Sequence, residues 1–161
     1  MKRIIIVEPD EDIYPSVTFY RIRFKDEEQT EFDKFFQKFD GDAEFEDDFN
    51  VILEYLDKIA SEGALDEFLR REGGSLKAIP GVSNKLRLYC FRVNECILLL
   101  GNGGHKPRNI RTYQEIPELH KYVLDLEKTG KHLKNRVRNS TKASIYGCKL
   151  HGNLEFEIET T

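Results

Sequence analysis

The sequence predicts an α+β fold in which N-terminal helices pack on an antiparallel β-meander sheet. Three observations lead to this class. A segment near the N-terminus alternates with period two, two later segments repeat apolar residues every three or four positions, and short strand-like runs return after Ser75. A chain of 161 residues with 39% hydrophobic content is long enough to bury a core. We therefore expect a single domain over residues 1–161.

The first elements are strands. Residues 3–7 form a short β-branched run, and residues 16–24 alternate between two faces. The acidic segment between them carries Pro9 and Pro15, which predicts a loop.

Helices follow. Thr30 is a candidate N-cap for a helix that ends at Gly41, because Phe side chains recur after it at helical spacing. Residues 45–62 carry an apolar stripe of the same period, and Gly63 ends it. A further short helix is expected within residues 65–74.

The meander is expected from residue 76 onward. Residues 76–82 contain Pro80 and predict an irregular or edge strand. Residues 85–92 and 96–101 predict a hairpin joined by Val93-Asn94. The alternation places Leu86, Leu88 and Cys90 on one face of the first strand, and Arg87, Tyr89 and Phe91 on the other.

Residues 101–107 read as a glycine-rich exit from this hairpin, without the ending of a phosphate-binding P-loop. A C-terminal helix should start near Pro117 and end or kink at Thr129-Gly130. The remaining extension, residues 131–161, is basic and then strand-like. Residues 144–150 and 154–160 are expected to pair around residues 151–153.

Charge is divided along the chain. Residues 1–75 hold 10 Lys/Arg against 21 Asp/Glu, whereas residues 76–153 hold 15 against 5. One interpretation is that the two parts neutralise each other in the fold. The other, which we favour, is a basic face that meets phosphate.

Three cysteines cannot all pair within one chain, and their spacing matches no zinc pattern. We interpret them as small buried hydrophobes in a reducing compartment, with a catalytic thiol as the alternative. The longest apolar run, residues 96–100, is too short to span a bilayer, and acidic residues interrupt the N-terminal run. We expect a cytoplasmic protein that contacts no membrane.

The candidate chemistry is metal-independent RNA cleavage. A base takes the proton of a ribose 2′-OH, cations stabilise the phosphorane, and an acid protonates the leaving oxygen. Candidate catalytic residues are Arg87, Tyr89, His105 and Lys106, and candidate RNA-binding residues are Arg92, Arg108, Arg111 and Tyr113. His105 is the expected proton shuttle. Each has a plainer interpretation: a solvated histidine, an aromatic–cation pair on the sheet, or solvated charges. No residue set has metal-ligand spacing, so neither a metal nor another cofactor is expected.

The segment from Lys85 to Gly130 resembles the RelE/HigB-type toxins of bacterial type II toxin–antitoxin systems, within the RelE/ParE superfamily and closest to its phage-derived, HigB-like group. The resemblance rests on Leu86-Arg87-Leu88-Tyr89, on Ile97 to Gly101, and on His105-Lys106 in place of a lysine pair. It covers about residues 16–130 and leaves residues 131–161 as an unmatched extension.

This resemblance implies a RelE/ParE-like fold and an endoribonuclease (mRNA interferase) that cuts mRNA on the ribosome. It also implies a co-encoded helix-turn-helix antitoxin, through which alone DNA would be contacted. Two alternatives remain. The first is an inactive relative that binds a protein, such as gyrase or the antitoxin. The second is an interaction module using acidic helix residues expected to be exposed: Asp47, Asp48, Glu54 and Asp57.

Overall fold

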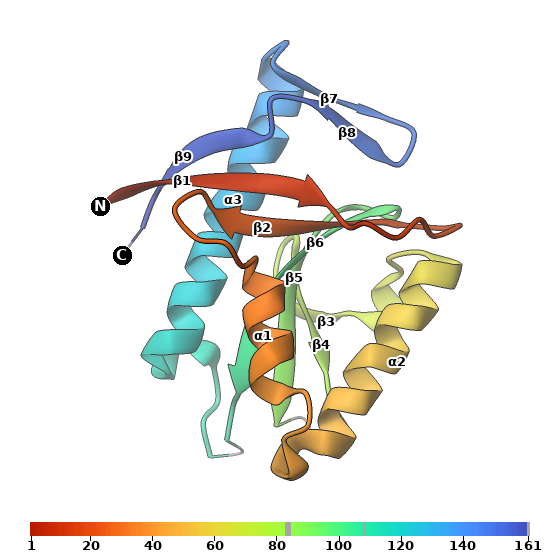
Figure 1. Cartoon of the computed structure of the whole chain (residues 1–161), viewed down its shortest axis with the longest axis vertical. Coiled ribbons are helices and arrows are strands. Elements are labelled where there is room, and N and C mark those ends of the chain that lie inside the picture. Colours follow the sequence, from red (N-terminus) through yellow and green to blue (C-terminus); the bar gives the residue numbers. More distant parts are fainter. Residues whose placement is uncertain (83–84, 108, 161) are drawn as a thin grey trace.

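The computed structural model describes residues 1–82, 85–107 and 109–160. Over these residues the fold is mixed α+β, with one large sheet, a separate two-stranded ladder and three α-helices (Figure 1). The helices are α1 (Glu31–Phe39), α2 (Glu46–Glu62) and α3 (Pro117–Asn139), with short 3-10 turns at Ala43–Phe45, Asp66–Phe68 and Tyr113–Glu115. The strands are β1 (Lys2–Pro9), β2 (Thr18–Phe24), β3 (Arg70–Gly73), β4 (Leu76–Pro80), β5 (Leu86–Asn94), β6 (Ile97–His105), β7 (Ala143–Tyr146), β8 (Lys149–Gly152) and β9 (Glu155–Glu159). The predicted fold class is confirmed at this level.

The large sheet has the strand order β3-β4-β5-β6-β2-β1-β9. Strands β4, β5 and β6 form the predicted antiparallel meander. Strand β2 lies parallel to β6, with Phe19 opposite Leu98. A parallel pair needs a crossover connection, and α1, α2 and the β3–β5 strands provide it. The sequence order of strand, helices, meander and helix is therefore the order in the structure.

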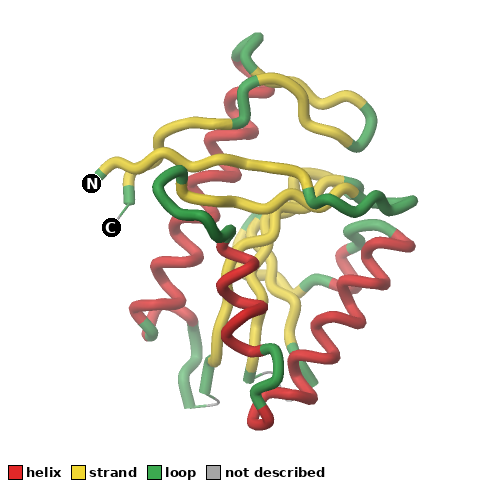
Figure 2. Tube along the Cα trace, in the orientation of Figure 1, coloured by secondary structure: helices red, strands yellow, loops and turns green. Residues whose placement is uncertain are grey.

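Helices α1 and α2 cover one face of the sheet (Figure 2). Thr30 caps α1: its hydroxyl accepts from the Asp33 N–H, and the Asp33 carboxylate accepts from the Thr30 N–H. Gly63 caps α2 with a positive φ of 107°, which favours glycine. Both predicted boundaries are confirmed to within a residue or two.

The prediction that Asp48 is an exposed acidic residue is wrong. Asp48 lies in the first turn of α2 and is buried, and its carboxylate accepts a hydrogen bond of 3.0 Å from the Leu86 backbone N–H. Helical period alone does not separate a buried polar contact from a solvated one. The residues that follow α2 also differ from expectation, because only Asp66–Phe68 forms a helical turn and β3 comes next.

Helix α3 covers the opposite face, and it passes through Thr129-Gly130 without ending there. The expectation of a stop at this pair is wrong because Leu126, Gly130 and Leu133 form one buried stripe against the sheet. Gly130 allows a close approach, because a Cβ at this position would overlap the ring of Phe91. Tertiary packing here outweighs the low helix propensity of glycine.

The C-terminal strands pair differently from the prediction. Strand β9 adds to the sheet edge beside β1, with Ile5 opposite Phe156. Strands β7 and β8 form their own hairpin, which turns at Gly147 with a φ of 62°. The predicted pairing of residues 144–150 with residues 154–160 is therefore wrong, because the first segment pairs within itself as β7 and β8 and the second pairs with β1.

The middle hairpin is also longer than predicted. Its turn lies at Glu95-Cys96 rather than Val93-Asn94, and β6 runs through the glycine-rich segment to His105. A Cβ at Gly103 would overlap the Arg87 carbonyl, so glycine allows the two strands to approach there. The register shifts by one residue between Leu88 and Cys90 at the same place.

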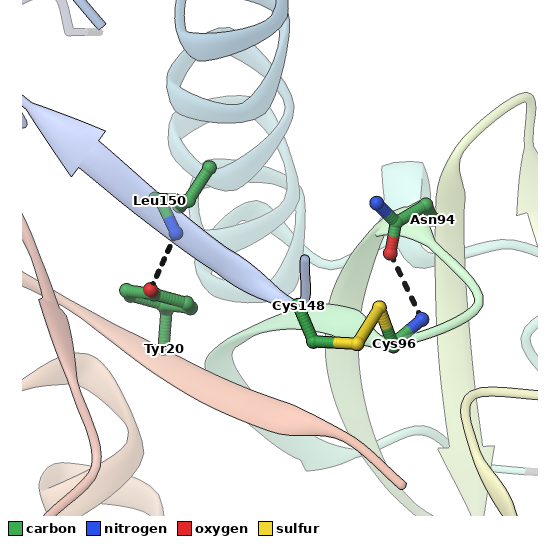
Figure 3. The surroundings of a disulfide bond; sticks show 5 residues. All are labelled: Tyr20, Asn94, Cys96, Cys148 and Leu150. Carbon is green, nitrogen blue, oxygen red and sulfur yellow. Dashed lines mark hydrogen bonds between the residues drawn. A yellow bond between two sulfur atoms is a disulfide. The ribbon is translucent and has the colours of Figure 1, made fainter. Parts of the chain in front are cut away.

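Two of the cysteines are joined. Cys96 and Cys148 form a disulfide across 52 residues, which ties the β7–β8 hairpin to the end of the middle hairpin (Figure 3). The interpretation of all three cysteines as buried hydrophobes is thus wrong for this pair. It holds for Cys90, which is completely buried and whose thiol pKa is raised by that burial.

Candidate functional site

The register of β5 and β6 decides which predicted residues share a face. Arg87 lies opposite Gly104, and Leu86 lies opposite His105. Residues directly opposite each other in an antiparallel pair point to the same side of the sheet. Arg87 and Tyr89 share one face, as their alternation predicted, and this face lies against α3, whereas His105 shares the α1/α2 side with Leu86. The His105 ring lies 5.0 Å from the ring of Phe45.

A buried polar group lies on the α3 side. Arg87 is 2% exposed, and its Nη1 donates to Oε1 of Glu72 at 3.1 Å. Glu72 comes from β3 and reaches Arg87 across β4. Lys106, the residue after β6, is also buried, and its Nζ donates to the Ile110 carbonyl at 2.6 Å. We call Arg87, Glu72 and Lys106 the buried charge cluster.

Burial and positive charge dominate the electrostatics of this cluster. Burial raises the pKa of Glu72, even though Arg87, Arg70 and Lys106 all act to lower it. Burial also lowers the pKa of Arg87, and the charge on Glu72 opposes that change. The pKa of Lys106 is lowered by burial first and then by the charges of Arg87 and Arg70. Desolvation thus outweighs pairing at each group, which moves the acid and the base toward neutral forms.

Two tyrosines border the cluster. Tyr89 is fully buried, and burial raises the pKa of its hydroxyl. A side chain with no exposed surface is not placed to stack on a base. Tyr113 packs edge-on against Tyr89 at 5.9 Å between ring centroids, and it is half-buried. Its other neighbour is the ring of His120, at 6.0 Å. Tyr113 is therefore the aromatic side chain with access to solvent here.

The remaining predicted RNA-binding cations are dispersed. Arg92 points to the α1/α2 side, where its Nε donates to the Ala64 carbonyl at 2.6 Å and fixes the segment after α2. Arg111 is exposed, and its backbone N–H donates to Glu115. Arg108 lies outside the described residues.

The structure thus brings Arg87, Tyr89, Lys106 and Tyr113 together and leaves His105 and Arg92 on the other side. Sequence reasoning missed Glu72. Glu72 lies between two arginines and two glycines, in a segment that the sequence predicted to be helical. The side of the sheet on which its side chain lies follows only from the pairing of β3 with β4. Glu72 supplies a nearly buried carboxylate beside Arg87, whereas the predicted proton shuttle, His105, lies on the other side of the sheet.

No protein-family model, curated protein or solved structure matched this chain in the comparisons. The site is therefore interpreted from its own geometry. Across residues 1–82, 85–107 and 109–160, no three His, Cys, Asp or Glu side chains gather as metal ligands would. In the same part of the chain, no helix is long and apolar enough to cross a membrane.

Proposed function

We propose that this protein is a RelE/HigB-like toxin that acts on mRNA at the ribosome, with the buried charge cluster as its reaction centre. The proposal includes the RelE/ParE-like fold, the phage-derived HigB-like grouping, a cytoplasmic location and a co-encoded helix-turn-helix antitoxin. The observation that carries it is the cluster itself. Arg87 of β5 pairs with the carboxylate of Glu72, whose pKa burial raises, and the charge of Lys106, the residue after β6, acts on the same carboxylate; Arg87 and Lys106 are both among the catalytic residues that the resemblance implies.

In this proposal Arg87 and Lys106 keep the catalytic roles that the sequence suggested, and Glu72 replaces His105 as the proton acceptor. Glu72 accepts the proton of the ribose 2′-OH, whose oxygen then attacks the adjacent phosphorus. Arg87 stabilises the charge of the phosphorane, and Lys106 donates a proton to the leaving 5′-oxygen. The products are a 2′,3′-cyclic phosphate and a 5′-hydroxyl. A raised carboxyl pKa and a lowered ammonium pKa both suit proton transfer near neutral pH.

Substrate entry has a structural requirement. The Lys106 ammonium is held by the Ile110 carbonyl, and Arg87 and Lys106 are both nearly inaccessible. A ribose-phosphate must therefore replace the Ile110 carbonyl at Lys106. Tyr113, the half-buried aromatic side chain beside the cluster, supplies a surface on which a neighbouring base stacks.

The test is translation-coupled mRNA cleavage by wild type, Glu72→Gln and Glu67→Gln. The first substitution keeps the shape and the hydrogen-bond acceptor for Arg87 but removes the proton acceptor. The second makes the same change at an exposed glutamate nearby. We expect Glu72→Gln to lose about 100-fold or more in cleavage rate, with Glu67→Gln unchanged. Equal cleavage by Glu72→Gln would refute the role of the cluster.

A second candidate function is binding without cleavage, favoured by one observation. His105 packs against Phe45 on the far side of the sheet from Arg87, so the predicted catalytic group is not assembled. In this case the protein acts through a protein partner, such as gyrase or the antitoxin. Wild type that arrests growth without cleaving mRNA would support binding, and a supercoiling assay would test gyrase directly. Rescue of growth by the neighbouring antitoxin gene is expected under both functions.

A further inference from the structure

The most basic part of the chain takes no part in the proposed reaction. Residues 128–154 contain seven Lys/Arg and no Asp or Glu. They form the second half of α3 and the β7–β8 hairpin, which Figure 1 shows together at one end of the molecule. Helix α2, with its acidic first turn, lies away from this end in the same view.

The outer face of the hairpin is polar and aromatic. In the β7–β8 register, Ser144 pairs with His151 and Tyr146 pairs with Lys149. All four are exposed, and they share one face of the ladder because side chains alternate along each strand. Tyr146 is 79% exposed, and its ring lies 6.2 Å from that of His151. An exposed tyrosine offers a flat aromatic surface for contact, and its side chain loses little conformational entropy when a partner binds.

The inner face fixes the hairpin to the body. Ala143 and Leu150 are buried against it, and the Leu150 backbone N–H donates to the Tyr20 hydroxyl at 2.7 Å. The Cys96–Cys148 disulfide adds a covalent anchor at the turn (Figure 3). The outer face is therefore held in place before any partner arrives, which reduces the entropy lost on binding.

Some cations of the chain are paired with carboxylates, and in the described part of the chain three at this end are not. Arg21 and Arg23 both form ion pairs with carboxylates, at 2.7–3.1 Å. Among the described residues, no carboxylate lies within ion-pair distance of Arg138, Lys142 or Lys149, all of which are exposed. The pKa of Lys134 is lowered by burial first and then by the charges of Arg138 and Arg92, as expected in a positive field.

We infer that Arg138, Lys142 and Lys149, together with Tyr146 on the outer hairpin face, form a docking surface for the phosphate backbone of a nucleic acid. We call these four residues the terminal basic surface. Three cations that have no carboxylate partner among the described residues give salt-dependent attraction to phosphates, and the exposed ring of Tyr146, opposite Lys149 in the hairpin, stacks on an unpaired base. The inference does not depend on the proposed cleavage, because the surface includes no residue of the buried charge cluster.

The experiment measures binding of the oxidised full chain to a fluorescent RNA hairpin, to a DNA duplex of matched sequence and to vesicles rich in phosphatidylserine. The test variant is Arg138→Gln/Lys142→Gln/Lys149→Gln. The control variant, Lys2→Gln/Lys58→Gln/Lys121→Gln, makes the same change in net charge at exposed positions elsewhere. Thermal melting of both variants checks that the fold is kept.

We expect the test variant to bind nucleic acid at least about tenfold more weakly than wild type at 0.15 M salt, with a salt slope reduced by about 2 to 3. The control should keep wild-type affinity within about threefold. Tyr146→Ala should weaken binding to the single-stranded loop of the RNA by about fivefold or more, and to the DNA duplex very little. Equal binding by test and control variants, no nucleic-acid binding by wild type, or binding to vesicles alone would each overturn the inference.

Discussion

The contact between Gly130 and Phe91 gives the sharpest test of how α3 packs. Gly130 lies in the middle of α3, and a Cβ built on it would sit 2.5 Å from Cδ1 and Cδ2 of the Phe91 ring. Ordinary carbon–carbon contacts are about 3.5–4.0 Å, so Gly130→Ala requires the helix or the ring to move by about 1 Å. Both residues are buried, and Phe91 is 2% exposed.

Two opposing terms set the size of this effect. Alanine in a helix interior gains about 1 kcal/mol over glycine. Overpacking a well-filled core costs about 1–3 kcal/mol, and this contact is close enough to reach the upper value. We therefore expect Gly130→Ala to lower the free energy of unfolding by about 2 kcal/mol. For a chain of this length, that corresponds to a melting temperature about 4–8 °C lower.

Urea denaturation followed by circular dichroism measures the change, with the disulfide intact in every sample. The matched control is Gly130→Ala combined with Phe91→Leu, because a smaller side chain leaves room for the methyl group. The two substitutions should show a favourable coupling of about 1 kcal/mol or more. If Gly130→Ala stabilises the protein by about 1 kcal/mol, the glycine has no neighbour to clash with, and the packing of α3 described above is wrong.

Three further predictions concern single contacts. Thr30→Ala should lower the free energy of unfolding by about 1 kcal/mol in urea denaturation, because it removes the hydroxyl of the capping box, while Thr30→Ser should stay near wild type. Burial raises the pKa of Asp125 above its ordinary 3.8, so its charged form disfavours the fold at higher pH. Asp125→Asn should therefore stabilise the protein at pH 7, by about 1 kcal/mol, and the gain should vanish below pH 3.8; a gain that persists in acid would contradict this cause. Reduction of the Cys96–Cys148 disulfide opens a loop of 52 residues and should lower the stability by up to about 4 kcal/mol. Thiol titration of the oxidised native protein should detect no reactive cysteine, because Cys90 is buried, and one after unfolding; three thiols in the unreduced, unfolded chain would show that the disulfide is absent.

Local signals in the sequence predicted local structure well. The Thr30 cap, the stop at Gly63 and the alternation of Arg87 with Leu88 all depend on residues within a few positions of each other. In each case the deciding interaction is a hydrogen bond or a face preference that a short segment makes by itself. Such elements are predictable because tertiary packing reinforces the local preference.

Pairings between distant segments were not predictable in the same way. The sequence carries no sign that residues 155–159 pair with β1, or that Cys148 lies beside Cys96. The same holds for Gly130, whose role depends on a ring about 40 residues earlier in the chain. These features are set by where the sheet edge and the helix come to lie, and a single sequence does not contain that information in its periodicity.

The candidate site shows how one residue of register changes a functional interpretation. His105 and Lys106 are neighbours, but a strand sends neighbouring side chains to opposite sides. The turn at Glu95-Cys96 and the register shift near Tyr89 fix which of the two faces Arg87. From the sequence, both residues could be assigned to one surface; in the structure only Lys106 joins Arg87.

The charge division along the sequence has a physical consequence in the fold. Among the described residues, few carboxylates of the acidic part pair with cations of the basic part: Glu72 pairs with Arg87, and Asp66 lies 3.9 Å from Lys77. Arg138, Lys142 and Lys149 remain exposed and without ion pairs in the described part of the chain. Mutual neutralisation therefore accounts for the cations that hold the sheet together, and not for those of the terminal basic surface. Exposed ion pairs contribute little to stability, so there is little energetic reason for such cations to be paired internally. These three cations have no ion pairs among the described residues, and they lie on or next to the β7–β8 hairpin, which the disulfide holds in place. Their positive electrostatic potential is therefore directed outward at one end of the molecule. An anionic partner is therefore drawn to that end, whether or not the buried charge cluster cuts RNA.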